Sequence, residues 1–255
     1  MCGSRIASAT DIDFEGPGYL SGTVIGQNGW VTNSYVGPPN GTVAVSSDGP
    51  LTGAQSLLYD QAAAAVGFSA SDVSTPHVIT ATNGNPGTDL IVSYLMSSTG
   101  NAFNGNGWGG LALSHNMFSG SSPIFLELRG DKFWTGENFA LVEVPGFSYV
   151  NGDVLKVTYE IDFDVEELDI SVFNQTMAVH EFTQTFDFFT PFPQEGPGGE
   201  YFVDVGLALR RGTVRFDDIV LTTVPEPTGA ALGLAAGLAA IYGCRAARGM
   251  GRLEV

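Results

Sequence analysis

The sequence predicts an all-β protein: an antiparallel two-sheet β-sandwich followed by one C-terminal transmembrane helix. From residue 10 to residue 223, short alternations of apolar and polar residues are separated by glycine, proline, asparagine and aspartate, and the 255-residue chain holds 34 glycines. This punctuation is typical of many short strands joined by turns. No amphipathic pattern long enough for a three-turn helix occurs before residue 228, where a long uncharged stretch begins.

The clearest strand is predicted at residues 155–164, where apolar and polar residues alternate. Its apolar positions are Leu155, Val157, Tyr159, Ile161 and Phe163. Because successive strand residues point to opposite faces, we expect one buried face and one solvated face. The alternation resumes at Leu168 after a short turn, so the two segments predict an antiparallel hairpin.

Further strands are expected throughout the region between residues 10 and 223. The segments with suitable patterns are 42–45, 56–59, 77–82, 90–97, 111–114, 124–129, 139–144, 177–182, 201–209 and 214–223. About a dozen strands exceed what one twisted sheet usually holds, so we expect two packed sheets. They would form one sandwich domain over residues 10–223.

Composition and charge restrict the classes of partner. Hydrophobic residues make up 44% of the chain and charged residues 15%, as expected for a folded domain. Asp and Glu number 27 against 10 Lys and Arg, which gives a formal net charge of -17. Because such a charge repels phosphate backbones, we expect no nucleic-acid partner. Cations and neutral polymers are more compatible ligands.

The chain has two cysteines, Cys2 and Cys244, one near each end. Residues 3–243 therefore cannot form a disulfide framework or a cysteine-ligated metal site. Near the start, Arg5 precedes small residues of the kind that a signal peptidase accepts, although the apolar core of a signal is missing. We interpret residues 1–9 as the remnant of a secretion signal; an ordinary disordered N-terminus is the alternative.

The C-terminal tail, residues 224–255, predicts a membrane span. Residues 228–244 carry no charge and would form a helix about 25 Å long, at the lower limit for crossing a bilayer. The Arg-rich end at 245–255 follows at once, and basic residues that flank a span stay on the cytoplasmic side. The predicted sandwich would then lie outside the membrane.

The order Val-Pro-Glu-Pro, apolar span and basic end resembles the PEP-CTERM sorting signal of exported bacterial proteins. The resemblance assigns the recognition motif to Pro225, Glu226 and Pro227 and the stop signal to Arg245 and Arg248. It implies processing by a membrane-embedded transpeptidase of the exosortase type and delivery to the cell surface or its polysaccharide matrix. A retained C-terminal anchor is the alternative.

Three acids in the strand at 155–164, Glu160, Asp162 and Asp164, resemble the E-x-D-x-E motif of jelly-roll glycosidases. In that family the motif supplies a nucleophile and an acid/base, and retaining hydrolysis needs two carboxyl groups about 5–5.5 Å apart. Strand residues four apart have Cα atoms roughly 13 Å apart, and aspartate is one methylene shorter than glutamate. We therefore interpret these acids as a solvated polar face and expect no catalytic residues.

Both ends of the predicted domain carry acidic pairs, Asp13 with Glu15 in the first strand and Asp217 with Asp218 in the last. Together with the segment GQNGWV at 26–31, they resemble concanavalin-A-like jelly-roll domains; a galactose-binding-like sandwich is the alternative. The resemblance implies a structural calcium held by Glu15, Asp217 and Asp218, since carboxylates suit this cation. Exposed acids in an acidic protein are the simpler interpretation.

Sugar binding calls for flat aromatic side chains on a solvated face, and Trp108 and Trp134 are the candidates. Packing in the core or at its rim is the simpler interpretation of both tryptophans. The sequence thus predicts an exported, non-enzymatic surface or matrix protein with an exosortase and extracellular polysaccharide as partners. A glycosidase with a degenerate motif and a purely structural matrix component are the alternatives.

Overall fold

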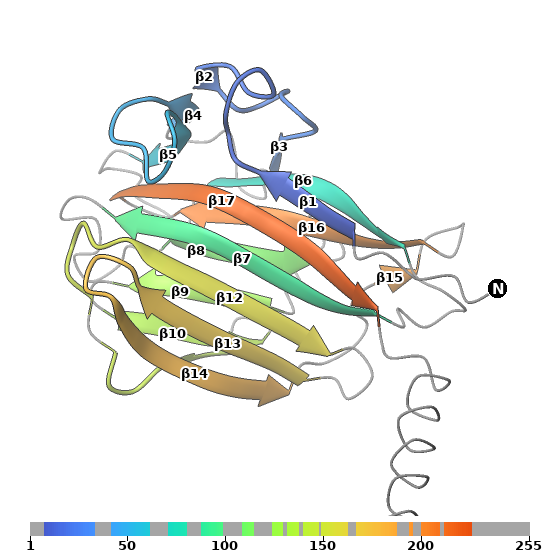
Figure 1. Ribbon diagram of the computed structural model, residues 1–255, viewed down its shortest axis with the longest axis vertical. Coiled ribbons are helices and arrows are strands. Elements are labelled where there is room, and N and C mark those ends of the chain that lie inside the picture. Colours follow the sequence, from blue (N-terminus) through green and yellow to red (C-terminus); the bar gives the residue numbers. More distant parts are fainter. Residues whose placement is uncertain are drawn as a thin grey trace, which may run out of the picture.

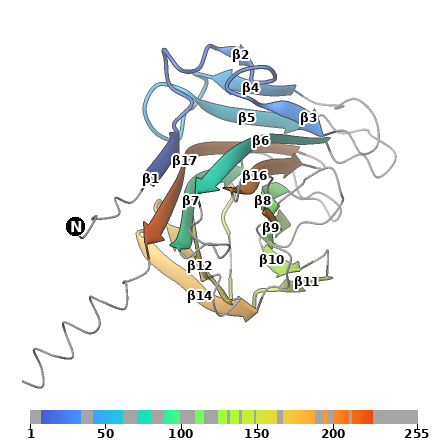
Figure 2. The same ribbon diagram turned by 90° about the vertical axis from the view of Figure 1, so that its right-hand side faces the viewer.

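The computed structural model shows two antiparallel β-sheets packed face to face (Figure 1). It describes residues 8–33, 42–61, 71–80, 88–98, 109–114, 124–129, 132–137, 140–147, 149–162, 167–187, 194–195, 200–209 and 212–225. Seen after a 90° turn, the sheets form two layers (Figure 2). The predicted all-β sandwich is confirmed.

Sheet A contains nine of the described strands and lies in front in Figure 1. In spatial order its main path is β14 (Val179–Asp187), β13 (Glu167–Asn174), β12 (Leu155–Asp162), β7 (Thr88–Ser98), β17 (Gly212–Pro225), β5 (Ser56–Gln61), β4 (Thr42–Ser46) and β2 (Gly22–Thr23). The ninth strand, β1 (Ser8–Ile12), also pairs with β17. Strands from both ends of the chain therefore meet in one sheet.

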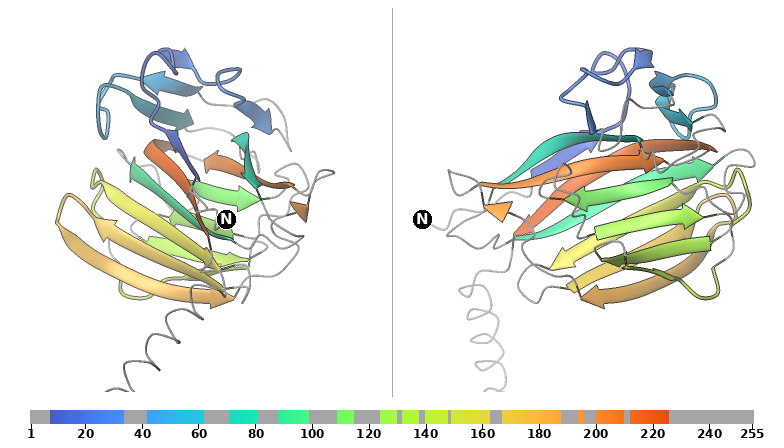
Figure 3. Two further views of the ribbon diagram at one scale, coloured as in Figure 1. Left: turned by 45° about the vertical axis from the view of Figure 1, so that its right-hand side comes forward. Right: turned by 180° about the vertical axis from the view of Figure 1, so that it is seen from behind.

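Sheet B contains eight of the described strands and lies nearer the viewer in the right-hand view of Figure 3. Its main path is β11 (Ala140–Glu143), β10 (Lys132–Glu137), β9 (Ile124–Arg129), β8 (Gly109–Ser114), β16 (Glu200–Leu209), β6 (Ser71–Thr80) and β3 (Val31–Asn33). The short β15 (Gln194–Glu195) pairs with β16.

The core lies between the two sheets, and the alternation in β12 explains how it forms. The apolar residues of β12 are buried, whereas Lys156 and Glu160 are exposed. Tyr159 is paired with Val92 of β7 and Ile170 of β13, so inward residues line up across three strands. Burying one such side chain fully contributes about 1.5–3 kcal/mol. The predicted hairpin is confirmed as β12 and β13.

A chain of hydrogen bonds ties the two sheets together inside the core. The hydroxyls of Tyr94 and Tyr159, both on sheet A and both buried, lie 3.0 Å apart, and their rings meet edge to face at 5.7 Å. The Tyr159 hydroxyl donates to the carbonyl of Leu111 on β8 at 3.2 Å. Burial raises the pKa of both phenols, so both stay protonated at neutral pH.

The first strand ends earlier than the sequence predicts. β1 ends at Ile12, so Asp13 and Glu15 lie in the connection that follows, and the prediction that places them in the strand is wrong. Asp13 Oδ1 accepts a hydrogen bond from the Glu15 amide at 3.0 Å, which forms an Asx-type turn. Phe14 between them has a φ of 56°, in the left-handed region that strands exclude.

The ends of the sandwich extend slightly beyond the expected domain. β1 begins at Ser8, and Ser8 and Ala9 pair with β17 although the sequence places them in the signal remnant. β17 runs on to Pro225. The expected span at 228–244 lies outside the described residues. In the part of the chain that the structure describes, no helix is long and apolar enough to cross a membrane.

Candidate functional site

The outer face of sheet A, the side turned away from the core, carries polar side chains from several neighbouring strands. On β12 this face consists of Lys156, Thr158, Glu160 and Asp162, the polar partners of the buried alternation. The strand register places further polar side chains next to these on the neighbouring strands. Thr158 is paired with Ser93 of β7 on one side and with Ser171 of β13 on the other.

Four hydroxyl side chains therefore form a row across four adjacent strands. Ser171 is paired in turn with Thr183 of β14, which completes the hydroxyl row of Ser93, Thr158, Ser171 and Thr183. The first three are half-buried and Thr183 is exposed. Each hydroxyl donates one hydrogen bond and accepts others, so this row offers both polarities to a ligand.

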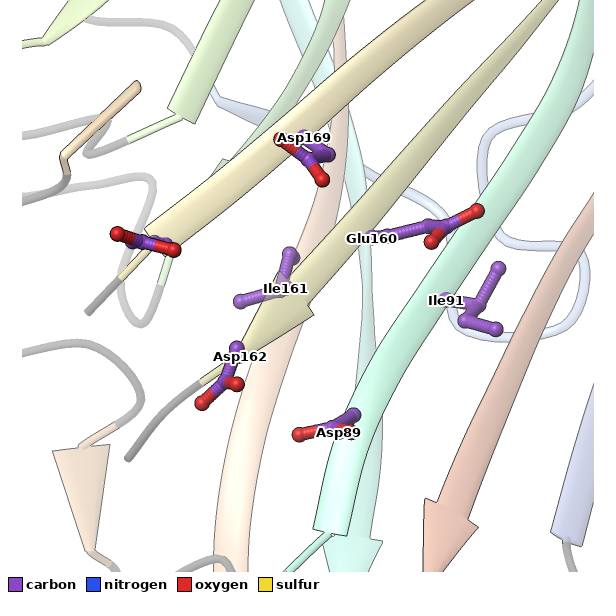
Figure 4. A pocket seen from close by; sticks show the side chains of 7 residues that line it. Asp89, Ile91, Glu160, Ile161, Asp162 and Asp169 are labelled. Carbon is purple, nitrogen blue, oxygen red and sulfur yellow. The ribbon is translucent and has the colours of Figure 1, made fainter. Parts of the chain in front are cut away.

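On one side of the hydroxyl row lies a hollow of about 240 Å³, termed here the acidic hollow. It is lined by Asp89, Ile91, Glu160, Ile161, Asp162, Glu167 and Asp169, most of which are labelled in Figure 4. Register places Glu160 opposite Asp169, and Asp162 opposite Glu167. Like charges directly opposite each other on a sheet are destabilising, so this arrangement has a cost for the fold.

The orientation of these acids bears on the glycosidase alternative. Glu160 extends from β12 toward Ile91 on β7, and not toward Asp169 on β13 (Figure 4). The carboxylate of Asp169 accepts a hydrogen bond from Thr185 at 2.5 Å. Glu160 and Asp162 do share the outer face, as the E-x-D-x-E pattern requires, but Asp164 lies outside the described residues.

On the other side of the hydroxyl row lies a second hollow of about 370 Å³, termed the mixed hollow because its lining carries both charges. Its residues come from β1, β7, β12, β17, the connection between β4 and β5, and the turn after β13. They are Asp11, Thr52, Ser93, Tyr94, Leu95, Lys156, Gln175, Asp218 and Val220. Burial raises the pKa of the Asp11 carboxyl, and the charges of Asp13 and Asp218 raise it further.

Asp217 and Asp218, predicted as calcium ligands, lie at a junction of three strands. β17 pairs with β5 up to Phe216 and with β1 from Ile219 onward, and a bulge lies between the two pairings. Asp218 sits in this bulge with a φ of 46°. The fully buried Asp217 accepts hydrogen bonds at 3.1 Å from the amide and the hydroxyl of Thr52, and this hydroxyl lies 3.1 Å from Asp218 Oδ2 as well.

Glu15, the third predicted calcium ligand, binds the same connection a few residues further on. Its Oε1 accepts hydrogen bonds from the amides of Ala54 at 2.6 Å and Gln55 at 2.9 Å. Gly53 has a φ of 56°, and a Cβ at that position would overlap Glu15 Oε1. Among the described residues no group of three or more His, Cys, Asp and Glu is arranged to hold a metal ion. The calcium site stays a prediction, without further support from this geometry.

Trp134, the one predicted aromatic residue that the structure describes, lines neither hollow. Trp134 is half-buried on β10 of sheet B, paired with Glu127 on β9 and Glu143 on β11. Beside it, Lys132 forms an ion pair with Glu143 at 2.5 Å. Trp108 lies outside the described residues. Of the sorting motif, Pro225 is the last residue of β17, whereas Glu226, Pro227, Arg245 and Arg248 lie outside the described part.

The sequence prediction did not include either hollow. The mixed hollow collects Asp11, Lys156, Gln175 and Asp218 from four distant segments, and only the strand register brings them together. The sequence gives one indication of this face, the polar residues that alternate with apolar ones at 155–164. They indicate a solvated face but do not indicate which residues of other strands lie next to it.

Two antiparallel sheets of this size and order define a lectin-like, concanavalin-A-like β-sandwich. The structure is similar to arcelin-5, a lectin-like defence protein from Phaseolus vulgaris, with a TM-score of 0.52 and 12% identity over 85% of this chain and 98% of arcelin-5. Lectin I from Ulex europaeus, solved with a methyl glycoside of α-L-fucose, gives a TM-score of 0.53 and 10% identity, over 86% and 98% of the two chains.

A bacterial protein shares the fold to the same degree. A protein of unknown function from Shewanella oneidensis MR-1 has a TM-score of 0.53 and 12% identity, over 87% of this chain and 88% of that one. At such identities the likeness establishes the fold alone. No model of a known protein family matches the sequence, and no curated protein matches it either.

Proposed function

We propose that this protein binds carbohydrate, and that a linear polysaccharide lies on the outer face of sheet A. The observation that carries the proposal is the arrangement of two hollows on either side of the hydroxyl row. Lys156 lines one hollow and Asp162 the other, and six strand residues span about 20 Å. A ligand that fills both hollows is therefore an extended chain.

The chemistry of this face matches a polyhydroxylated ligand. Sugar hydroxyls donate hydrogen bonds to carboxylates such as Asp11 and Glu160, and they accept hydrogen bonds from amides such as Gln175. Ile91 and Val220 supply apolar surface between these polar groups, against which the C–H faces of sugar rings can pack. Mixed apolar and polar lining of this kind is usual in small-molecule sites.

The binding test uses the full chain and a panel of linear neutral oligosaccharides, with affinity measured by calorimetry. We expect Thr158→Tyr, which places a bulky ring between the hollows, to lower affinity at least tenfold. Trp134→Ala on the other sheet is the matched variant and should leave affinity unchanged. The reverse result would move the site to the tryptophan face of sheet B. No binding to any glycan would favour the structural-matrix alternative.

We further propose that the protein is exported and sorted to the cell surface or matrix through its C-terminal tail, with an exosortase-type transpeptidase as partner. The support is the Pro225-Glu226-Pro227 motif, the uncharged stretch at 228–244 and the arginines after it. Intact-mass measurement of the surface protein tests this proposal. A mature chain that ends near residue 227 is expected, and a chain still carrying Arg248 would mean a retained anchor.

A further inference from the structure

Lys156 is a conspicuous cation on an acidic molecule. It is exposed on β12, and its cross-strand neighbours are Leu95 and Phe173, neither of which carries a charge. The other described basic side chains are occupied. Lys132 pairs with Glu143, and the Arg215 guanidinium donates to the Asp48 carbonyl at 3.2 and 3.3 Å.

No hydrogen bond or ion pair joins the Lys156 ammonium to any residue that the structure describes. It instead lines the mixed hollow, whose opposite wall carries the carboxylates of Asp11 and Asp218. In a chain with 27 acids and 10 basic residues, a cation without an acidic partner is unusual. A lysine in this position behaves as a point charge available to an anionic group.

The walls of the mixed hollow are held in place by contacts among the lining residues and with residues behind them. The Asp218 carboxylate lies 3.1 Å from the Thr52 hydroxyl, and Thr52 is in turn held by the buried Asp217. On the other side, the backbone amide of Gln175 donates to the Val154 carbonyl at 2.8 Å, which fixes the turn after β13. Such support keeps the lining groups in one arrangement before a ligand arrives, and this lowers the entropic cost of binding.

We propose that the mixed hollow binds a sugar unit that carries one anionic substituent, a carboxylate or a sulfate ester, which pairs with Lys156. Asp11 and Asp218 accept hydrogen bonds from the hydroxyls of the same unit. The acidic hollow repels anions, so the unit bound there is neutral. The ligand is therefore a polysaccharide with sparse acidic units and not a uniform polyanion. This inference rests on the proposed carbohydrate binding.

The experiment compares three ligands of equal length: the neutral hexasaccharide that binds best in the panel, the same hexasaccharide with one uronate, and the same hexasaccharide with one sulfate ester. We expect the full chain to bind at least one of the two anionic forms about tenfold more tightly than the neutral form. The uronate and sulfate arms then show which substituent fits. The preference should weaken as salt is added, because the pair is partly solvent-exposed.

Two variants assign this preference to Lys156. Lys156→Gln should bind the anionic and neutral forms equally, and Lys156→Arg should restore part of the preference. Lys132→Gln removes one positive charge from sheet B and should keep the full preference, which separates a local pair from the effect of net charge. Thermal unfolding of each variant confirms that it folds.

The outcomes distinguish this inference from the function on which it rests. If the full chain binds the neutral hexasaccharide at least as tightly as both anionic forms, or if Lys156→Gln keeps the preference, the inference is wrong while carbohydrate binding stands. If no oligosaccharide of any kind binds, the proposed function and the inference both fail.

Discussion

At the scale of single residues, the acids near the chain ends act as hydrogen-bond acceptors for one connection. Asp217 and Asp218 hold Thr52, and Glu15 holds the amides of Ala54 and Gln55. Each of these carboxylates therefore has at least one hydrogen-bond donor from the chain itself. The sequence indicated that the acidic pairs matter at the ends of the domain, but it could not indicate their partners, because Thr52 is far from both pairs along the chain.

The buried carboxyl of Asp217 should make stability depend on pH. Burial raises its pKa from 3.8 to about 6, although hydrogen bonds from Thr52 and the Asp218 amide oppose the shift. Between these values the folded chain keeps a proton that the unfolded chain releases, so the contribution of Asp217 to stability falls as pH rises from about 4 to about 6. Above pH 6 the full cost of the buried charge remains.

Asp217→Asn removes this titration and tests the assignment. Relative to the wild-type protein, the variant should gain roughly 1–3 kcal/mol in the free energy of unfolding between pH 4.5 and pH 7.5, since one pKa unit corresponds to about 1.4 kcal/mol. Denaturant unfolding at the two pH values measures the change. Parallel pH profiles for the two proteins would show that Asp217 has an ordinary pKa in the folded chain.

At the scale of elements, the alternation at 155–164 predicted β12, its buried face and its hairpin with β13. The start of β6 was harder to predict. This strand begins at Ser71, whereas the sequence indicated a start at His77, after Pro76. Pro76 is paired with Asp204 of β16 on one side, and on the other side the described pairing with β3 covers only Asp72 to Ser74. Among the described residues, no strand pairing on the β3 side therefore needs the N–H that proline lacks.

The hydrogen bond from the Tyr159 hydroxyl to the Leu111 carbonyl joins the two sheets and should contribute to the free energy of unfolding. Tyr159→Phe leaves the Leu111 carbonyl and the Tyr94 hydroxyl without this partner in the core, and it should cost about 1–3 kcal/mol. Tyr94→Phe removes a hydroxyl of the same kind but keeps the bond between the sheets, so it should cost less. Denaturant unfolding compares the two variants, and an equal or larger loss for Tyr94→Phe would contradict this role.

At the scale of the whole molecule, the sandwich was predictable because its strands repeat a local pattern, whereas the site was not. The predicted tryptophans lie on sheet B or outside the described residues, and the two hollows lie on sheet A. A face is built from residues that register makes neighbours, such as Ser93, Thr158 and Ser171, and register depends on the order of the strands in the sheet. The order of the strands cannot be predicted from the local pattern of any one segment.

The most direct test of the proposed binding face is backbone amide NMR of the full chain during titration with the neutral hexasaccharide that it binds best. We predict that the amide shifts concentrate on β7, β12 and β13, around the hydroxyl row and both hollows, with little change on β9 and β10. Shifts that centre on Trp134 and the strands of sheet B instead would contradict it.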